Sequence, residues 1–269
     1  MQSPLKMLFK SARGLLFVAL LLVTSQSSNA QADEQVHRVL FVGNSYTYVN
    51  SLPQLFKALY EHAMPGHRVE VKFVGGGGAT LEKHWEVEEA QAEIRSGRWD
   101  FVVLQGQSML GSSDLTAPGG ADIFFEYARR FDGEIVESGA RTVFYMTWSR
   151  ENRKQDQQYL SDAYTKIGSE LGSIVAPVGM VWDQLRDNPA VDLYQGDGSH
   201  PEIAGSYLAA TTLLAAIFDI QPSEAPGELY GHEILRGGAL SPDERRLSDL
   251  SAAQVGLVLS AVSQVFVTN

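Results

Sequence analysis

The stretch HRVLFVGNSYT, residues 37–47, is a short apolar run that ends at a glycine and continues into polar residues. Residues 37–42 are rich in β-branched and aromatic side chains and are apolar on both faces of a strand. Such runs are typical of the central strands of a parallel sheet with helices on each side. The segment Gly43-Asn44-Ser45 would then lie at the carboxyl edge of that sheet, where open α/β folds bind their ligands.

Four further runs of this kind follow, separated by helical patterns. The predicted strands cover residues 37–42, 68–74, 100–104, 141–147 and 172–177, and the predicted helices 51–63, 81–95, 120–138, 157–171, 201–218 and 241–267. For the last helix, Ser241 fits an N-cap, Pro242 the first helical position, and Glu244 completes a capping box. The alternation predicts an α/β fold, a three-layer α/β/α sandwich with a central parallel, flavodoxin-like sheet.

Residues 1–32 are predicted to be a secretory signal peptide. Three basic residues precede an apolar run over residues 14–23, and the small residues that follow end in Ala30-Gln31-Ala32, an A-x-A cleavage pattern. The apolar run is too short to cross the ~30 Å hydrocarbon core of a bilayer. We expect cleavage after Ala32 (Ala30 as second choice), export to the periplasm or the medium, and no stable membrane anchor; a retained anchor is the alternative.

The mature chain, residues 33–269, is acidic and free of cysteine. The signal segment holds three of the 21 Lys and Arg residues and none of the 32 Asp and Glu residues, so 18 basic residues stand against 32 acidic ones, a formal charge of −14. An acidic surface repels phosphate backbones, so no nucleic-acid partner is expected. The lack of Cys excludes disulfides, thiolate catalysis and a Cys-linked lipid. The length of the mature chain and the absence of repeats predict a single catalytic domain. The oligomeric state stays open.

Two residues, Gly43 and Asn44, separate the first predicted strand from Ser45, which lies near the start of the next helix. Helix dipole and free backbone N–H groups favour developing negative charge there. Taken alone, a helix cap by Ser45 or Thr47 is the alternative. The second strand ends in four glycines, residues 75–78, whose unobstructed N–H groups suit an oxyanion hole. A flexible turn is the alternative, and no phosphate-binding or dinucleotide fingerprint accompanies the glycines.

Two later segments carry further polar side chains. Gln105-Gly106-Gln107-Ser108 follows the third strand, and its amides can donate hydrogen bonds into a site or simply to neighbouring loops. Asp197-Gly198-Ser199-His200 precedes an apolar helix, and its carboxylate can orient an imidazole that deprotonates a serine. A structural Asp–His turn is one alternative. A metal site is the other, but no second His lies three or four residues away and both His84 and His232 stand alone, so no metal or organic cofactor is expected.

In this order the segments resemble the blocks of the SGNH/GDSL hydrolase superfamily, from Val39 to about Ala210. GNSYT stands at the nucleophile block, with Asn44 in place of its Asp, and DGSHP matches the D-x-x-H block. GGGGAT stands at the glycine block, where Gly78 is aligned to the oxyanion-hole donor and Gly77 is the second choice. The resemblance implies a serine ester hydrolase that works through an acyl-enzyme.

The third block departs from the family's G-x-N-D pattern. Gln105-Gly106-Gln107-Ser108 is similar to the Q-G-x-S form of the carbohydrate-acetylesterase branches. Its position relative to the strand favours Gln107 as the oxyanion donor, and the acetylesterase-like pattern favours Gln105. The resemblance thus implies Ser45, Asp197 and His200 as the triad, and the N–H groups of Ser45 and Gly78 with one Gln amide as the oxyanion hole.

The expected substrate is a small-molecule or carbohydrate ester, chiefly an O-acetyl or short acyl ester on sugar. Export, the acidic surface and the third block favour it. Asn44, Tyr46 and Tyr194 are expected next to the substrate. The rings of Tyr46, Trp85, Trp148 and Tyr194 could stack on sugars or belong to the core. The alternatives are a lipase or thioesterase with an apolar groove, a catalytically idle sugar-binding module, a phosphate-ester-cleaving role, and acyl transfer to an alcohol.

Overall fold

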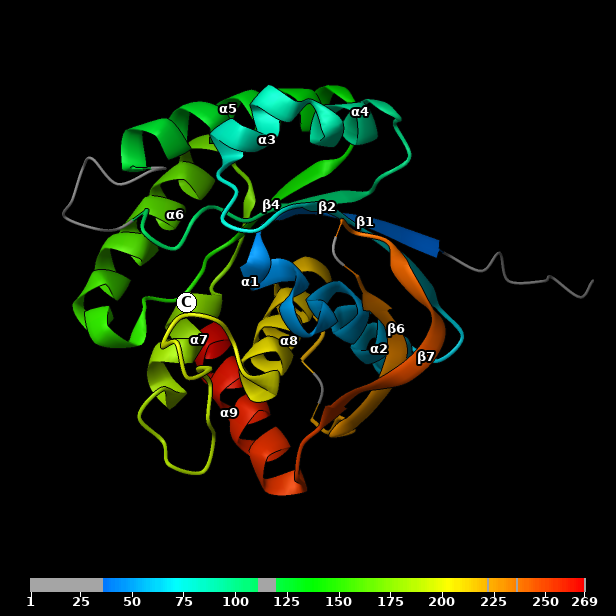
Figure 1. Cartoon of the computed structure of the whole chain (residues 1–269), viewed down its shortest axis with the longest axis vertical. Coiled ribbons are helices and arrows are strands. Elements are labelled where there is room, and N and C mark those ends of the chain that lie inside the picture. The colour runs from blue at the N-terminus through cyan, green and yellow to red at the C-terminus, as the bar shows by residue number, and fades with distance from the viewer. Residues whose placement is uncertain (1–35, 111–119, 222, 236, 269) are drawn as a thin grey trace, which may run out of the picture. The chain divides into compact units, whose positions relative to one another are not determined.

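A five-stranded parallel sheet forms the centre of the structure, a computed structural model that describes residues 36–110, 120–221, 223–235 and 237–268 (Figure 1). The predicted signal peptide lies outside the described residues. The strand order is β2-β1-β3-β4-β5. The strands are β1 (Val36–Gly43), β2 (Arg68–Gly75), β3 (Phe101–Leu104), β4 (Arg141–Tyr145) and β5 (Ile174–Ala176).

The central strand β1 explains why the sheet needs a helical layer on each face. Val39 and Phe41 point into one hydrophobic cluster, and Leu40 and Val42 point into the other. All four side chains are fully buried. Because successive residues of a strand face opposite sides, a run that is apolar at every position must be covered twice.

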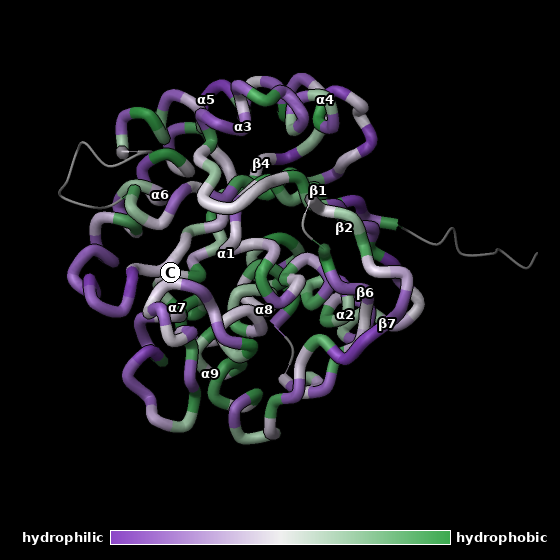
Figure 2. The backbone as a smooth tube through the Cα atoms, viewed as in Figure 1, coloured by the Kyte–Doolittle hydropathy of each residue, from purple (hydrophilic) through white to green (hydrophobic). Residues whose placement is uncertain are grey.

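The helices divide into two layers around this sheet (Figure 1). One layer holds α2 (Leu52–Ala63), α7 (Val178–Leu185), α8 (Ile203–Phe218) and α9 (Ala252–Thr268), and the other holds α3 (Leu81–Val87), α4 (Glu89–Arg95), α5 (Ala121–Glu137) and α6 (Gln157–Leu171). Helix α8 is buried along most of its length, and Figure 2 shows it as one of the most apolar segments. The predicted three-layer α/β/α sandwich is confirmed. None of the helices in the described ranges is long and apolar enough to span a bilayer.

The predicted helix over residues 241–267 is wrong in its first third. Residues 240–249 form strand β7 (Leu240–Asp249), which pairs antiparallel with β6 (Glu228–Ile234), a strand absent from the prediction. Ser241 does not cap a helix, because its hydroxyl accepts from Glu233 N at 2.9 Å and donates to Asp243 O at 2.8 Å. The charged stretch mimics the start of a helix, and pairing with a distant segment overrides that local preference.

Two smaller differences concern helix limits. The single helix predicted over 81–95 is broken into α3 and α4 at Glu88, which has a left-handed backbone with φ of 62°. Helix α7 lies in a stretch without a predicted element, and α1 (Ser45–Tyr48) with the 3-10 turn Val49–Ser51 precedes α2.

Candidate active site

The turn after β1 brings Ser45 to the first position of α1. Asn44 caps this helix, since its side-chain oxygen accepts from Tyr46 N at 3.1 Å. The turn is tight: a Cβ on Gly43 would lie 2.4 Å from Thr47 Oγ1, and one on Gly75 would lie 1.9 Å from the Gly43 carbonyl oxygen. Only glycine therefore permits the close approach of β1 and β2 at this edge.

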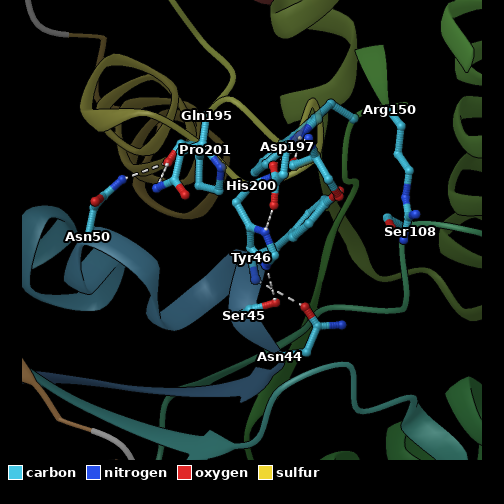
Figure 3. A network of polar contacts seen from close by, with 12 residues as sticks. Asn44, Ser45, Tyr46, Asn50, Ser108, Arg150, Gln195, Asp197, His200 and Pro201 are labelled. Atoms are coloured by element: carbon cyan, nitrogen blue, oxygen red, sulfur yellow. Dashed lines mark hydrogen bonds and ion pairs between the residues drawn. The ribbon is translucent and has the colours of Figure 1, made fainter. Parts of the chain in front are cut away.

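Ser45, His200 and Asp197 form one chain of hydrogen bonds (Figure 3). His200 Nε2 lies 2.9 Å from Ser45 Oγ, and His200 Nδ1 lies 2.5 Å from Asp197 Oδ2. The loop fixes the carboxylate further, because the backbone N–H groups of Ser199 and His200 both donate to Asp197 Oδ1 at 2.9 Å. This is the nucleophile–base–orienter geometry of a serine hydrolase triad.

The electrostatics of the pair keep the carboxylate ionised. The hydrogen bond from His200, with the backbone N–H groups of His200 and Ser199, lowers the pKa of the Asp197 carboxyl to about 2. The charge favours Nδ1–H on the ring, which leaves Nε2 to accept the proton of Ser45. The side chains of His200 and Asp197 are 33% and 49% exposed, so the triad is open to solvent and to bulky ligands.

The glycine turn lies against the nucleophile turn. Asn44 Nδ2 donates to Ala79 O at 3.0 Å, which ties the two segments together, and Gly78 has a left-handed φ of 67°. Within the described ranges, neither the Ser45 N–H nor the Gly78 N–H donates to a protein acceptor. Both amides are therefore available to an external oxygen. Asn44 itself is buried, and both the oxygen and the nitrogen of its side-chain amide are hydrogen-bonded within the protein. It therefore holds the turn, and the expectation that it contacts the substrate is not met.

The two glutamines of the third loop have different environments. Gln105 is fully buried; its Oε1 accepts from Asn44 N at 2.8 Å and from Thr47 Oγ1 at 2.9 Å, and its Nε2 donates to Gly106 O. The amide cannot be flipped, because Asn44 N–H requires an acceptor. Gln107 is partly exposed, and its Oε1 accepts from Met109 N, which leaves its NH₂ group without a protein acceptor among the described residues.

His84 is a site residue that the sequence prediction missed. It is buried in α3, and its Nε2 lies 3.0 Å from the carbonyl oxygen of Gly43, directly before Asn44. Burial lowers the pKa of His84 to about 4, so a neutral ring donates to that carbonyl at neutral pH. The only signal in the sequence was its position, four residues after Thr80, close to the glycine turn at the carboxyl edge of the sheet. The described residues contain no group of three or more His, Cys, Asp or Glu side chains that could hold a metal ion.

The aromatic residues near the triad belong to the core. Tyr46 stacks on Trp148 at 4.5 Å between ring centroids, and Trp148 stacks on Trp182 at 3.9 Å. These rings and Tyr194 are at most 7% exposed. Tyr46 and Tyr194 therefore offer no face to a sugar, and the core alternative holds for them and for Trp148. Trp85 packs on Phe131 of α5 in the opposite layer.

Polar contacts join the nucleophile segment to the histidine loop. Tyr46 Oη lies 2.6 Å from Ser199 Oγ, and its ring meets that of His200 edge-on at 5.8 Å. Asn50 Nδ2 donates to the carbonyl oxygen of Pro201 at 2.9 Å, although Asn50 adopts a left-handed φ of 55° (Figure 3). These contacts hold His200 over Ser45, and no sequence motif predicted them.

No family model and no curated protein matches the sequence. Solved structures do match. A protein from Slackia heliotrinireducens assigned to the SGNH hydrolases is 26% identical, with a TM-score of 0.55 over 68% of this chain and 100% of its own. An acetylxylan esterase from Geobacillus stearothermophilus is 18% identical (TM-score 0.53; 68% and 94%), and a lipase/acylhydrolase from Enterococcus faecalis is 18% identical (TM-score 0.54; 67% and 95%).

The parallel sheet with Ser45, His200 and Asp197 hydrogen-bonded at its carboxyl edge defines a hydrolase of the α/β/α type. Within that class, the structure is similar to the SGNH/GDSL hydrolases, the group to which the 26% identical protein from Slackia heliotrinireducens is assigned.

Proposed function

We propose that the protein is an exported serine esterase that hydrolyses O-acetyl or short acyl esters of carbohydrates through an acyl-enzyme. The observation that carries the proposal is the continuous chain Ser45–His200–Asp197 with both contacts of His200 at hydrogen-bond length. His200 takes the proton of Ser45 as the hydroxyl oxygen attacks the ester carbonyl. It then gives that proton to the leaving alcohol, and finally deprotonates the water that releases the acid.

The oxyanion hole would be formed by the N–H groups of Ser45 and Gly78 and the side-chain NH₂ of Gln107. In the described ranges the two backbone donors have no protein acceptor, and neither does the amide nitrogen of Gln107. Gln105 is the weaker candidate, because its amide nitrogen donates to Gly106 O and its oxygen holds the nucleophile turn. Donors aimed at the developing oxyanion typically contribute about 3–4 kcal/mol each to transition-state stabilisation.

The exposure of the triad supports a large alcohol on the substrate. Half of the Asp197 side chain and a third of the His200 side chain remain open to solvent, which allows a sugar chain to lie across the site. The cavity beside the glycine turn, about 350 Å³, has a mixed lining of glycine backbone, the polar side chains of Thr80, Lys83 and Glu89, and the apolar side chains of Val74 and Val87, so its wall is not apolar throughout. A long acyl chain would require an apolar groove.

The experiment is a hydrolysis panel on the purified protein. p-Nitrophenyl esters from acetate to palmitate are compared with O-acetylated oligosaccharides, and Ser45→Ala serves as the inactive control. The proposal predicts a sharp preference for acetate and loss of nearly all turnover in Ser45→Ala. Rates that rise with chain length would support the lipase or thioesterase alternative, and near-normal turnover of Ser45→Ala would end the proposal. A sugar acceptor added to the assay separates hydrolysis from acyl transfer.

Export rests on the amino-terminal segment alone. The predicted cleavage after Ala32 requires that the protein recovered from the cell envelope or medium begins at Asp33, which amino-terminal sequencing or intact mass determines. A full-length protein retained with its amino-terminal segment would contradict it.

A further inference from the structure

Arg150 is a cation at the active-site edge that has no carboxylate partner in the described part of the chain. Its Nη2 donates a long hydrogen bond, 3.4 Å, to Ser108 Oγ, and its Nε is buried without an acceptor among the described residues. Most other arginines are ion-paired with Asp or Glu: Arg38, Arg95, Arg98, Arg129, Arg130, Arg153, Arg186, Arg245 and Arg246. In a chain with this excess of acidic residues, an unpaired guanidinium at this place calls for an explanation.

The position of Arg150 connects it to two of the loops around the triad, the loop after β3 and the Asp197–His200 loop. Arg150 follows β4, and Ser108, its acceptor, follows β3 next to Gln107. The adjacent Glu151 donates its backbone N–H to Gly198 O at 2.9 Å, inside the Asp197–His200 loop. Figure 3 shows the Arg150 side chain extended toward Ser108 at the edge that holds Ser45 and His200. A group bound by Arg150 would therefore lie beside a substrate on Ser45.

Among the described residues, the carboxylates of the neighbouring Asp197–His200 loop and of Glu151 form no ion pair with Arg150. Asp197 is held by His200 and by two backbone N–H groups. Glu151 is exposed, and its carboxylate lies beside Gly198. A partly buried guanidinium with unused N–H groups is costly unless a ligand supplies the anion, and its planar fork fits a carboxylate.

We propose that Arg150 binds a carboxylate of the substrate, so that the preferred ester is an acidic one. This inference rests on the proposed esterase function and adds a substrate class to it. The carboxylate can be carried by the alcohol, as in an O-acetylated uronic acid, or by the acyl group, as in a dicarboxylic half-ester. In both cases Arg150 contacts the substrate and sets specificity, and His200 and Ser45 carry out the chemistry.

The test compares matched acidic and neutral esters on the purified protein. The alcohol arm pairs a methyl O-acetyl-glucuronide with the methyl O-acetyl-glucoside, and the acyl arm pairs p-nitrophenyl hemisuccinate with p-nitrophenyl butyrate. Wild type is compared with Arg150→Gln, Arg150→Lys and the control Arg141→Gln, which lies exposed at the opposite end of β4. The wild type should prefer the acidic ester in one arm, which identifies the source of the carboxylate.

In that arm, Arg150→Gln should lower kcat/KM for the acidic ester by about tenfold to a hundredfold more than for the neutral one, the usual range for a hydrogen bond to a charged group. Arg150→Lys should keep part of the preference, because it retains the charge without the fork. Arg141→Gln should keep the wild-type ratio. The wild-type preference should also shrink as salt rises, since the pair is partly solvent-exposed.

Two outcomes overturn the inference. The first is that the wild type shows no preference for the acidic ester in either arm. The second is that Arg150→Gln lowers kcat/KM equally for the acidic and the neutral ester, which would make Arg150 a residue that positions the Ser108 loop. If the Arg150 variants do not fold, the wild-type preference and its salt dependence decide. Failure of the esterase proposal is distinct, because then the wild type would hydrolyse neither member of any pair.

Discussion

The two glutamines of the third loop should respond in opposite ways to removal of their side chains. Gln105 Oε1 is the acceptor for two buried donors, Asn44 N–H and the Thr47 hydroxyl. Each buried donor left without an acceptor costs about 1–3 kcal/mol, so Gln105→Ala should lower the free energy of unfolding by about 2–6 kcal/mol. Gln107 is partly exposed and accepts only from Met109 N, so Gln107→Ala should cost about 0.5–1.5 kcal/mol in stability.

Turnover should show the reverse order once stability is taken into account. Gln107→Ala removes a proposed oxyanion donor, and kcat for p-nitrophenyl acetate should fall by about 10²–10³-fold with little change in KM. Urea unfolding followed by tryptophan fluorescence gives the stability of each variant, and rates are measured where each is fully folded. A stable, inactive Gln105→Ala together with a fully active Gln107→Ala would refute the assignment of the two amides and place Gln105 in the oxyanion hole.

Three further perturbations probe the groups that hold the triad. Burial depresses the folded-state pKa of His84 from 6.5 to about 4, so the free energy of unfolding should be constant above pH 6.5 and fall by about 3 kcal/mol as the pH drops toward 4. His84→Gln, whose amide can still donate to Gly43 O, should abolish that part of the pH dependence. If the free energies of unfolding of wild type and His84→Gln fell in parallel with pH, the prediction would be contradicted. Asp197→Ala should lower kcat by about 10³–10⁴-fold at neutral pH, and because its pKa is about 2, wild-type activity between pH 4 and 8 should show no inflection from this carboxyl. Tyr46→Phe should cost about 1 kcal/mol in urea unfolding through loss of the contact with Ser199, and an unchanged midpoint would show that this contact contributes nothing.

The sheet and the place of the catalytic segments could be predicted because they follow from local patterns. The doubly apolar run before Gly43 requires cover on both faces, and parallel strands bring their carboxyl ends to one edge. Ser45, Asp197 and His200 therefore meet there even though more than 150 residues separate the serine from the other two. The β6–β7 hairpin could not be predicted in the same way. Its pairing joins segments whose charged sequence carries a helix-like start signal at Ser241.

The contacts that orient the site were also beyond the sequence, because they depend on which donors remain unpaired after the backbone is folded. Gln105 and Gln107 have the same side chain two residues apart, yet one is fully buried and the other partly exposed. Only the buried one meets the free N–H of Asn44. The aromatic residues show the same limit. A ring near a catalytic loop can bind substrate or fill the core, and the stacking of Tyr46 on Trp148 settles it for the core.

The Asn at position 44 illustrates how a departure from a family pattern can have a structural cause. An Asp here could cap α1 through Tyr46 N–H equally well, and the helix N-terminus would favour its charge. It could not donate to Ala79 O, however, and its second oxygen would face that carbonyl where Asn44 Nδ2 now lies at 3.0 Å. The amide is therefore the group that satisfies both neighbours. Because this bond fixes the glycine turn next to Gly78, the identity of residue 44 and the position of the proposed oxyanion hole are coupled through a single hydrogen bond.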